Sequence, residues 1–205
     1  YRPSSKMQFS FSADWTHFDG KARCEQPNEY FSATNMPIRS DLFYSEPDKD
    51  IDIYALLADY KYTPNTQNEI LAGVKTTLIN SNNTFLFKKN GAIDTQRSNN
   101  FYYEEKNLEA YAQYTHSWNK IELSAGLRME YMHTYNRLKS QTNQDSETNK
   151  QSHFRLFPNL SASYTINEKS KIALLYSRRQ DKPRYEDLNP FEYLLDELTY
   201  WKGNP

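Results

Sequence analysis

Apolar and polar side chains alternate residue by residue along much of the chain. In the clearest segment, 121–131, even positions are polar or glycine and the apolar set is Ile121, Leu123, Ala125, Leu127, Met129 and Tyr131. A period of two is typical of a β-strand whose two faces meet different surroundings. The same pattern occurs in 7–16, 51–63, 69–79, 103–116, 160–166 and 172–176. The sequence therefore predicts an all-β fold, an antiparallel meander of about seven long strands.

The connections between these segments alternate between short and long. Short, turn-like connections occupy 63–68, 117–120 and 167–170, whereas long polar stretches occupy 20–50, 80–100, 134–153 and 179–199. Short turns on one side and long loops on the other are the rule for outer-membrane β-barrels. Segments of about ten residues also suit strands that cross an apolar band ~25 Å tall. We therefore expect a fragment of a large outer-membrane β-barrel, with lipid on one face and a wet lumen on the other.

The composition fits a barrel wall better than a soluble globule. Mean hydropathy is -0.95, which suggests a soluble chain, yet aromatic residues reach 15%, which argues against disorder. A wall with one wet face and aromatic girdles reconciles the two values. The 25 basic and 26 acidic side chains nearly cancel, so no nucleic-acid partner is expected. The single cysteine, Cys24, excludes an intrachain disulfide.

Few residues have the spacing that catalytic or metal chemistry requires. Asp48, Asp50 and Asp52 alternate as calcium ligands do, but the turn glycine and distal glutamate of such loops are missing. A solvated charge run is the favoured interpretation. The four histidines have no metal-ligand spacing, and the carboxylate pairs at 186–187 and 196–197 fit a structural role better than a glycosidase. We therefore expect no catalytic residue, no metal and no cofactor, hence a protein that is not an enzyme.

Residues towards the end of the sequence carry a family resemblance. They are Arg178, Arg179, Pro183, Tyr185, Asp187, Leu188, Asn189, Pro190, Phe191, Gly203, Asn204 and Pro205. With the Gly-Leu-Arg-Met-Glu segment at 126–130 and the Phe-Pro pair at 157–158, they resemble the outer-membrane protein β-barrel family found in TonB-dependent receptors of Bacteroidetes. The resemblance runs from about residue 52 to residue 205. Lys182 stands where the family usually has arginine, which keeps the charge but loses the planar fork.

The resemblance implies a role as well as a fold. Receptors of this kind close a barrel of about 22 strands around an N-terminal plug, and they import a bulky nutrient with energy from TonB. On this basis residues 1–205 form a partial β-barrel domain whose plug and remaining strands lie outside it. The expected location is the cell outer membrane. The expected partners are outer-membrane lipid, the plug of the same receptor and TonB, while the nutrient is not indicated.

Two alternatives concern particular features. The group Arg178, Arg179, Arg184 and Asp187 would touch cargo or plug if it lined the lumen, but anchoring of the adjacent loop is the favoured interpretation. For the whole chain, a soluble carbohydrate-binding β-sandwich would show the same alternation, with exposed rings such as Trp201 stacked on sugar faces.

Overall fold

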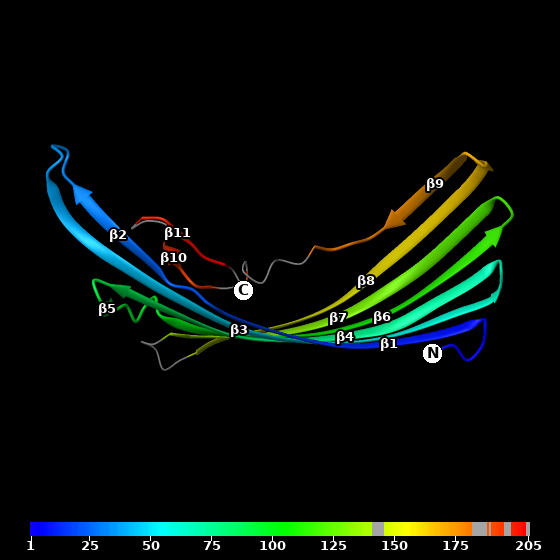
Figure 1. The fold of residues 1–205 in the computed structure, drawn as a ribbon, viewed down its shortest axis with the longest axis horizontal. Coiled ribbons are helices and arrows are strands. Elements are labelled where there is room, and N and C mark those ends of the chain that lie inside the picture. The colour runs from blue at the N-terminus through cyan, green and yellow to red at the C-terminus, as the bar shows by residue number, and fades with distance from the viewer. Residues whose placement is uncertain (141–145, 182–187, 189, 195–197, 204–205) are drawn as a thin grey trace.

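The chain forms one curved antiparallel sheet with a small two-stranded sheet in its concavity (Figure 1). The computed structural model describes residues 1–140, 146–181, 188, 190–194 and 198–203. Seven strands follow one another across the large sheet in the order β1-β3-β4-β6-β7-β8-β9. This half-barrel confirms the predicted antiparallel meander of about seven long strands.

The strands of the wall continue well beyond the lengths typical of soluble sheets. Their bounds are Met7–Lys21 (β1), Pro37–Asn65 (β3), Asn68–Lys89 (β4), Asn99–Trp118 (β6), Ile121–Ser140 (β7), Ser146–Asn167 (β8) and Ser170–Ser177 (β9). Four shorter strands are Cys24–Phe31 (β2), Ala92–Ile93 (β5), Tyr193–Leu194 (β10) and Tyr200–Trp201 (β11). β2 pairs with the start of β3, where it continues the edge begun by β1, and β5 pairs with β4.

The register gives the sheet two chemically different faces. Side chains in one row across the strands point the same way, and one such row is Phe11, Ala58, Val74, Ala110, Met129 and Leu156. This row lies on the convex face, because Phe191 contacts Phe85 and Phe101, which belong to the opposite set, from inside the curve. Val74 remains 51% exposed, as expected of a wall that meets lipid rather than a sealed core.

The long polar segments predicted as loops are mostly strand. Segments 37–50, 80–89, 134–140 and 146–153 all lie within β3, β4, β7 and β8, so the prediction of long structureless loops at 20–50, 80–100 and 134–153 is wrong. The reason is that successive residues on opposite faces are both polar in much of these extensions, as Asn82 and Asn83 are, and the rings that follow, Phe85 and Phe87, belong to the concave face. Backbone pairing continues there, but the regular alternation that reveals a strand in the sequence disappears.

The turns distinguish the two ends of the wall. Asn65 closes the β3–β4 turn, since its Oδ1 accepts hydrogen bonds from the backbone N–H groups of Gln67 (3.0 Å) and Asn68 (2.9 Å). Three short turns lie at this end, as predicted, at the right of Figure 1. At the opposite end Asn90 and Gly91 adopt φ values of 52° and 81° and form a two-residue turn before β5. Short turns mark the periplasmic side of such barrels.

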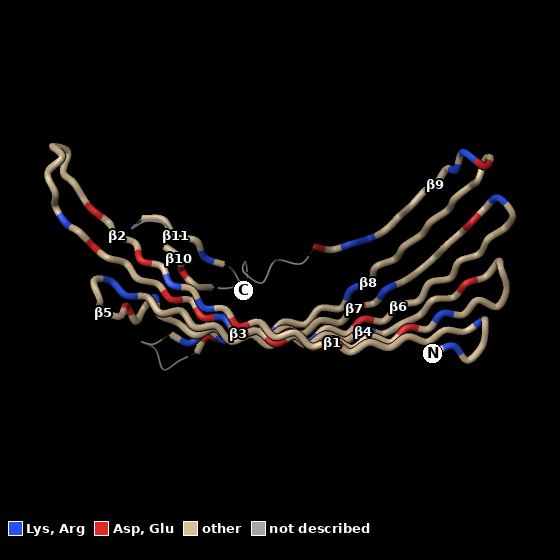
Figure 2. The backbone as a smooth tube through the Cα atoms, in the orientation of Figure 1, with Lys and Arg blue, Asp and Glu red and all other residues tan. Residues whose placement is uncertain are grey.

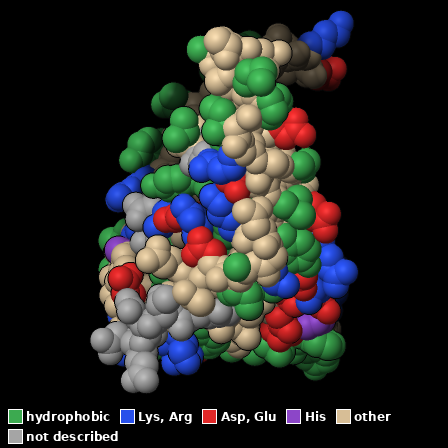
Figure 3. Space-filling model, turned by 90° about the vertical axis from the view of Figure 1, so that its left-hand side faces the viewer, with side chains coloured by type: hydrophobic (Ala, Val, Ile, Leu, Met, Phe, Trp, Pro, Cys, Tyr) green, Lys and Arg blue, Asp and Glu red, His purple; other side chains and the backbone are tan. Residues whose placement is uncertain are grey.

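Charged side chains lie along both ends of the wall rather than in one block. Figure 2 shows basic and acidic residues interspersed along the strands, and Figure 3 shows the same mixture at the end that carries β2. A mixed distribution agrees with the near-zero net charge of the whole chain.

Candidate functional site

The centre of the concave face holds a side-chain bridge across three strands. Asp59 on β3, Gly73 on β4 and Tyr111 on β6 are direct neighbours in the sheet. The Tyr111 ring lies over Gly73, and its hydroxyl donates a hydrogen bond to Asp59 Oδ1. A Cβ atom at position 73 would lie 2.6 Å from that carboxylate oxygen and closer still to the tyrosine hydroxyl. Glycine is therefore required by the close approach of the ring.

An ion network occupies the next strands along the same face. Glu109 and Glu130 stand directly opposite each other on β6 and β7, an arrangement that is unfavourable for like charges. Arg128 offsets it, because its Nη1 lies 2.9 Å from Glu109 Oε2 and 3.8 Å from Glu130 Oε2. The Arg128 guanidinium also lies 4.5 Å from the centre of the Phe157 ring. The network fixes a polar surface at the middle of the wall.

A cleft of about 500 Å³ lies beside this network on the concave face. Its walls include Lys75, Glu109, Asn136, His153 and Arg155. The Nη1 atom of Arg155 is buried without a hydrogen-bond partner among the described residues. Carboxylates, cations and amides in one recess form a surface suited to a polar partner or to water.

An aromatic cluster covers the concave face towards the end with the longer connections. Its members are Phe43, Phe85, Phe87, Phe101, Tyr103 and Phe191. Phe191 is 1% exposed and stacks on Phe85 with ring centres 5.3 Å apart, while Phe101 meets it edge-on at 6.4 Å. Tyr193 adds a further edge contact with Phe85 at 5.1 Å. Residues 188 and 190–194 thus pack into the concavity instead of continuing the wall.

A second recess, of about 480 Å³, lies between the wall and β10–β11. Phe18, Lys49, Tyr193 and Trp201 are among its lining residues. Tyr193 and Trp201 pair across the two short strands with ring centres 5.7 Å apart. These rings belong to the concave side, so they face the lumen of the half-barrel.

The structure gathers some of the motif residues and leaves others apart. Pro190 and Phe191 are buried, and Leu188 packs against the aromatic cluster. Arg178 and Arg179 are exposed directly after β9, and the Arg178 backbone N–H donates to the Pro158 carbonyl at 3.1 Å. Gly203 is half-buried. The motif residues that lie outside the described residues are Pro183, Tyr185, Asp187, Asn189, Asn204 and Pro205.

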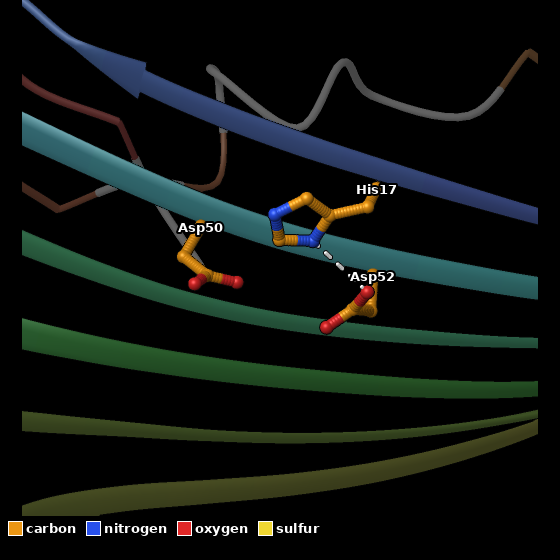
Figure 4. A group of neighbouring side chains, drawn as sticks. All are labelled: His17, Asp50 and Asp52. Atoms are coloured by element: carbon orange, nitrogen blue, oxygen red, sulfur yellow. Dashed lines mark hydrogen bonds and ion pairs between the residues drawn. The ribbon is translucent and has the colours of Figure 1, made fainter.

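A histidine–carboxylate group on the convex side was not predicted (Figure 4). His17 pairs with Asp52 across β1 and β3, and its Nδ1 lies 3.1 Å from Asp52 Oδ1. One ligand atom from each of His17, Asp50 and Asp52 lies within 4.8 Å of the others. Trp15 Nε1 also donates to Asp52 Oδ1 at 3.1 Å, so this oxygen is already engaged. The group is solvent-accessible and fits a hydrated polar rim above the apolar band.

A family model covers this arrangement from end to end. The model of the outer membrane protein beta-barrel family matches residues 3–205. The chain belongs to this family. The membership agrees with the apolar convex face and the polar concave face, and it locates the protein in the outer membrane. Within the described part of the chain, no helix has the length and hydropathy needed to cross a membrane.

Two solved structures share the fold at low sequence identity. The ferric yersiniabactin uptake receptor FyuA from Yersinia pestis matches with a TM-score of 0.60 and 13% identity, over 83% of this chain and 25% of that one. The ferric citrate transporter FecA in its unliganded form matches with a TM-score of 0.56 and 11% identity, over 82% and 24%. The chain thus spans about a quarter of each structure. A search of curated protein sequences found no match.

The fold gives no support to a soluble carbohydrate-binding sandwich. A sandwich buries the facing sides of two sheets, whereas the second sheet among the described residues consists of β10 and β11 with two residues each. The apolar convex row remains exposed, as at Leu108, which is 55% exposed.

Proposed function

We propose that the chain is part of the membrane-spanning barrel of a TonB-dependent receptor that imports a bulky nutrient. The observation that carries the proposal is the likeness of this half-barrel to an uptake receptor and a transporter over more than four-fifths of its length. The motif residues around Phe191 support a receptor of the type found in Bacteroidetes. On this proposal residues 1–205 supply seven strands of one barrel domain, and the rest of the protein supplies the other strands and the plug.

The two faces of the wall suggest different partners for each face. The convex face meets lipid, and the ion network of Arg128, Glu109 and Glu130 points into the lumen, where a plug of the same receptor would contact it. A polar, hydrogen-bonding lumen wall allows a plug to be held and released without exposure of a large apolar surface. Cargo would enter from the opposite end, past the rings that line the recess at Phe18 and Trp201.

The experiment is an uptake test in cells with and without the full-length gene and with and without TonB. The compounds removed from a complex medium are identified by mass spectrometry. The proposal expects at least one compound too large for general porins to disappear only when both proteins are present. Removal of the same compounds without TonB, or without this gene, would contradict it.

A crosslinking test addresses the plug separately. A photo-reactive amino acid replaces Lys75, which lies on the concave face beside the cleft, and a matched variant carries it at Val74 on the convex face. Crosslinks from position 75, but not from position 74, to N-terminal residues of the same protein are expected. Equal crosslinking from both positions would contradict a plug in the lumen.

A further inference from the structure

An apolar groove crosses the convex face near the end that carries the short turns. We refer to it as the convex groove; it has a volume of about 480 Å³, and its lining includes Tyr114, His116, Trp118, Leu123, Ala125, Leu160, Ala162, Leu174 and Tyr176. These residues come from β6, β7, β8 and β9, so four neighbouring strands form one depression.

The groove arises from the position of two alanines among large side chains. Ala125 lies opposite Leu160, and Ala162 lies opposite Leu123, so the two alanines are diagonal neighbours on β7 and β8. Their methyl groups form a low floor, whereas Leu123, Leu160 and Leu174 stand above it and are 42%, 53% and 76% exposed. A floor of small residues between ridges provides side walls that a flat apolar surface would lack.

One end of the convex groove is polar. Asn68 Oδ1 lies 2.6 Å from His116 Nδ1 and accepts a hydrogen bond from the Tyr114 hydroxyl at 2.5 Å. The His116 and Trp118 rings meet edge-on with centres 4.0 Å apart. Polar and aromatic side chains of this kind are typical of the membrane–water interface, so the groove begins at the interface and continues into the apolar band.

One of the nearby turns carries a lysine beside that polar end. Lys120 lies in the β6–β7 turn, two residues after Trp118 of the groove, and its ammonium donates to the Ile166 carbonyl at 3.4 Å. Lys171 and Glu122 lie 3.7 Å apart on the concave face, on the other side of the sheet from the groove. Lysines at an interface attract an anionic headgroup.

We propose that the convex groove binds one acyl chain of a phospholipid from the inner leaflet of the outer membrane, with its phosphate near Lys120 and His116. The occupant follows from three features: the groove lies on the lipid-facing wall, its polar end is at the periplasmic side, and the Lys120 ammonium lies in the turn beside that end. The inference rests on the outer-membrane location and not on the proposed import of a nutrient. Loss of import would therefore leave it intact.

The test measures lipid that remains bound to the full-length protein after purification in a mild detergent. Native mass spectrometry of the wild type should show one phospholipid per protein. The variant Ala125→Phe fills the floor, and each acyl methylene displaced from apolar contact weakens binding roughly fourfold. Displacement of two methylenes should therefore weaken lipid binding roughly sixteenfold and lower the lipid-bound fraction accordingly.

A matched control keeps the result specific to the groove. Ala110→Phe places the same ring on the convex face between Val74 and Met129, outside the groove, and should retain the lipid. Leu174→Ala lowers a groove wall without adding bulk and should also lose the lipid. Heat-modified mobility on a denaturing gel confirms that each variant forms the barrel.

Three results would overturn the proposal. They are an equal lipid-bound fraction in Ala125→Phe and wild type, an equal loss in Ala110→Phe, and a bound mass that corresponds to lipopolysaccharide. Retention of lipid in Ala110→Phe together with its loss in Ala125→Phe and Leu174→Ala would establish the site.

Discussion

The substitution Gly73→Ala tests the three-strand bridge on the concave face. The added methyl group would lie 2.6 Å from Asp59 Oδ1 and closer to the Tyr111 hydroxyl, so the tyrosine ring must move. Its movement breaks the hydrogen bond to Asp59 that joins β3 to β6 across β4. By comparison, the methyl group of Gly126→Ala meets the side-chain amide of Asn159 at 2.7–3.1 Å, and this flexible group can rotate away.

The expected cost follows from two effects that act together. Overpacking costs about 1–3 kcal/mol, and loss of a hydrogen bond to a carboxylate costs about 1.5–3 kcal/mol. Replacement of a strand glycine by alanine by itself stabilises the folded state by about 0.5–1 kcal/mol, because the unfolded chain loses conformational freedom. Since both penalties come from one displacement of Tyr111, we expect Gly73→Ala to lower the free energy of unfolding by about 2–4 kcal/mol. For Gly126→Ala we expect a cost below about 1 kcal/mol.

A double-mutant cycle separates this mechanism from a general intolerance of substitution. In the Tyr111→Ala background the Asp59 carboxylate still lies 2.6 Å from the added methyl group, but without its tyrosine partner this flexible side chain can rotate away. Gly73→Ala should therefore become neutral or stabilising by about 0.5–1 kcal/mol. The free energy of unfolding is measured for the full-length protein in lipid vesicles by denaturant titration. An equal cost of Gly73→Ala in both backgrounds would refute the close approach of Tyr111.

Three further predictions concern other parts of the wall. Phe191→Ala should detach the segment around residue 191 from the sheet without unfolding the sheet, because truncation of a buried Phe destabilises its packing by about 3–5 kcal/mol. Protease cleavage between β9 and β11 should then be faster than in the wild type. An unchanged cleavage rate would contradict the packing of Phe191 against the sheet. Arg128→Ala should lower the free energy of unfolding by about 2 kcal/mol, since two glutamates lose a partly exposed counter-ion. In the Glu109→Gln background the same substitution should cost less. Additive effects of the two substitutions in the double variant would argue against the network. Burial raises the pKa of Asp94, but hydrogen bonds from the Arg97 side chain and from backbone N–H groups outweigh it and leave the pKa below its ordinary value. Its stabilisation of this turn is therefore present above about pH 4 and lost as the pH falls through the lowered pKa. The protection factors of the amide hydrogens in the turn, which correct for the intrinsic exchange rate at each pH, should fall there, and Asp94→Asn should abolish this dependence.

The alternation of the sequence was sufficient to predict the part of each long strand that lies next to the short turns. It succeeded where one face meets lipid, as at Leu127 and Met129, because only there do the two faces differ in polarity. It failed at the strand extensions, where neighbours such as Asn82 and Asn83 are both polar. The pairing of those residues depends on backbone hydrogen bonds, which the side-chain pattern does not record.

One hairpin could have been predicted from a local signal. Asn90-Gly91 is a dipeptide with a strong preference for two-residue turns, because both positions tolerate positive φ. It lay within the segment 80–100 that was expected to be a loop. The turn returns the chain to β4 through the two residues of β5, and its recognition would have shortened the predicted loop.

The concave site depends on contacts that a single sequence does not contain. Asp59 and Tyr111 are separated by 52 positions, and they meet only because the register of β3, β4 and β6 places Gly73 between them. A glycine within a strand was the one available hint. His17 and Asp52 are likewise 35 positions apart. The motif around Phe191 was found by resemblance, but its position inside the concavity required the structure.

The assignment of lipid to the convex face and water to the concave face is tested most directly by spin labels on β4. Cysteines are introduced singly at residues 74–77 of the full-length protein, with Cys24 replaced by serine, and the labelled proteins are placed in lipid vesicles. Labels at Val74 and Thr76 should be accessible to oxygen dissolved in the bilayer, and labels at Lys75 and Thr77 to a water-soluble nickel chelate. Uniform accessibility along the four positions, or the opposite alternation, would contradict the account.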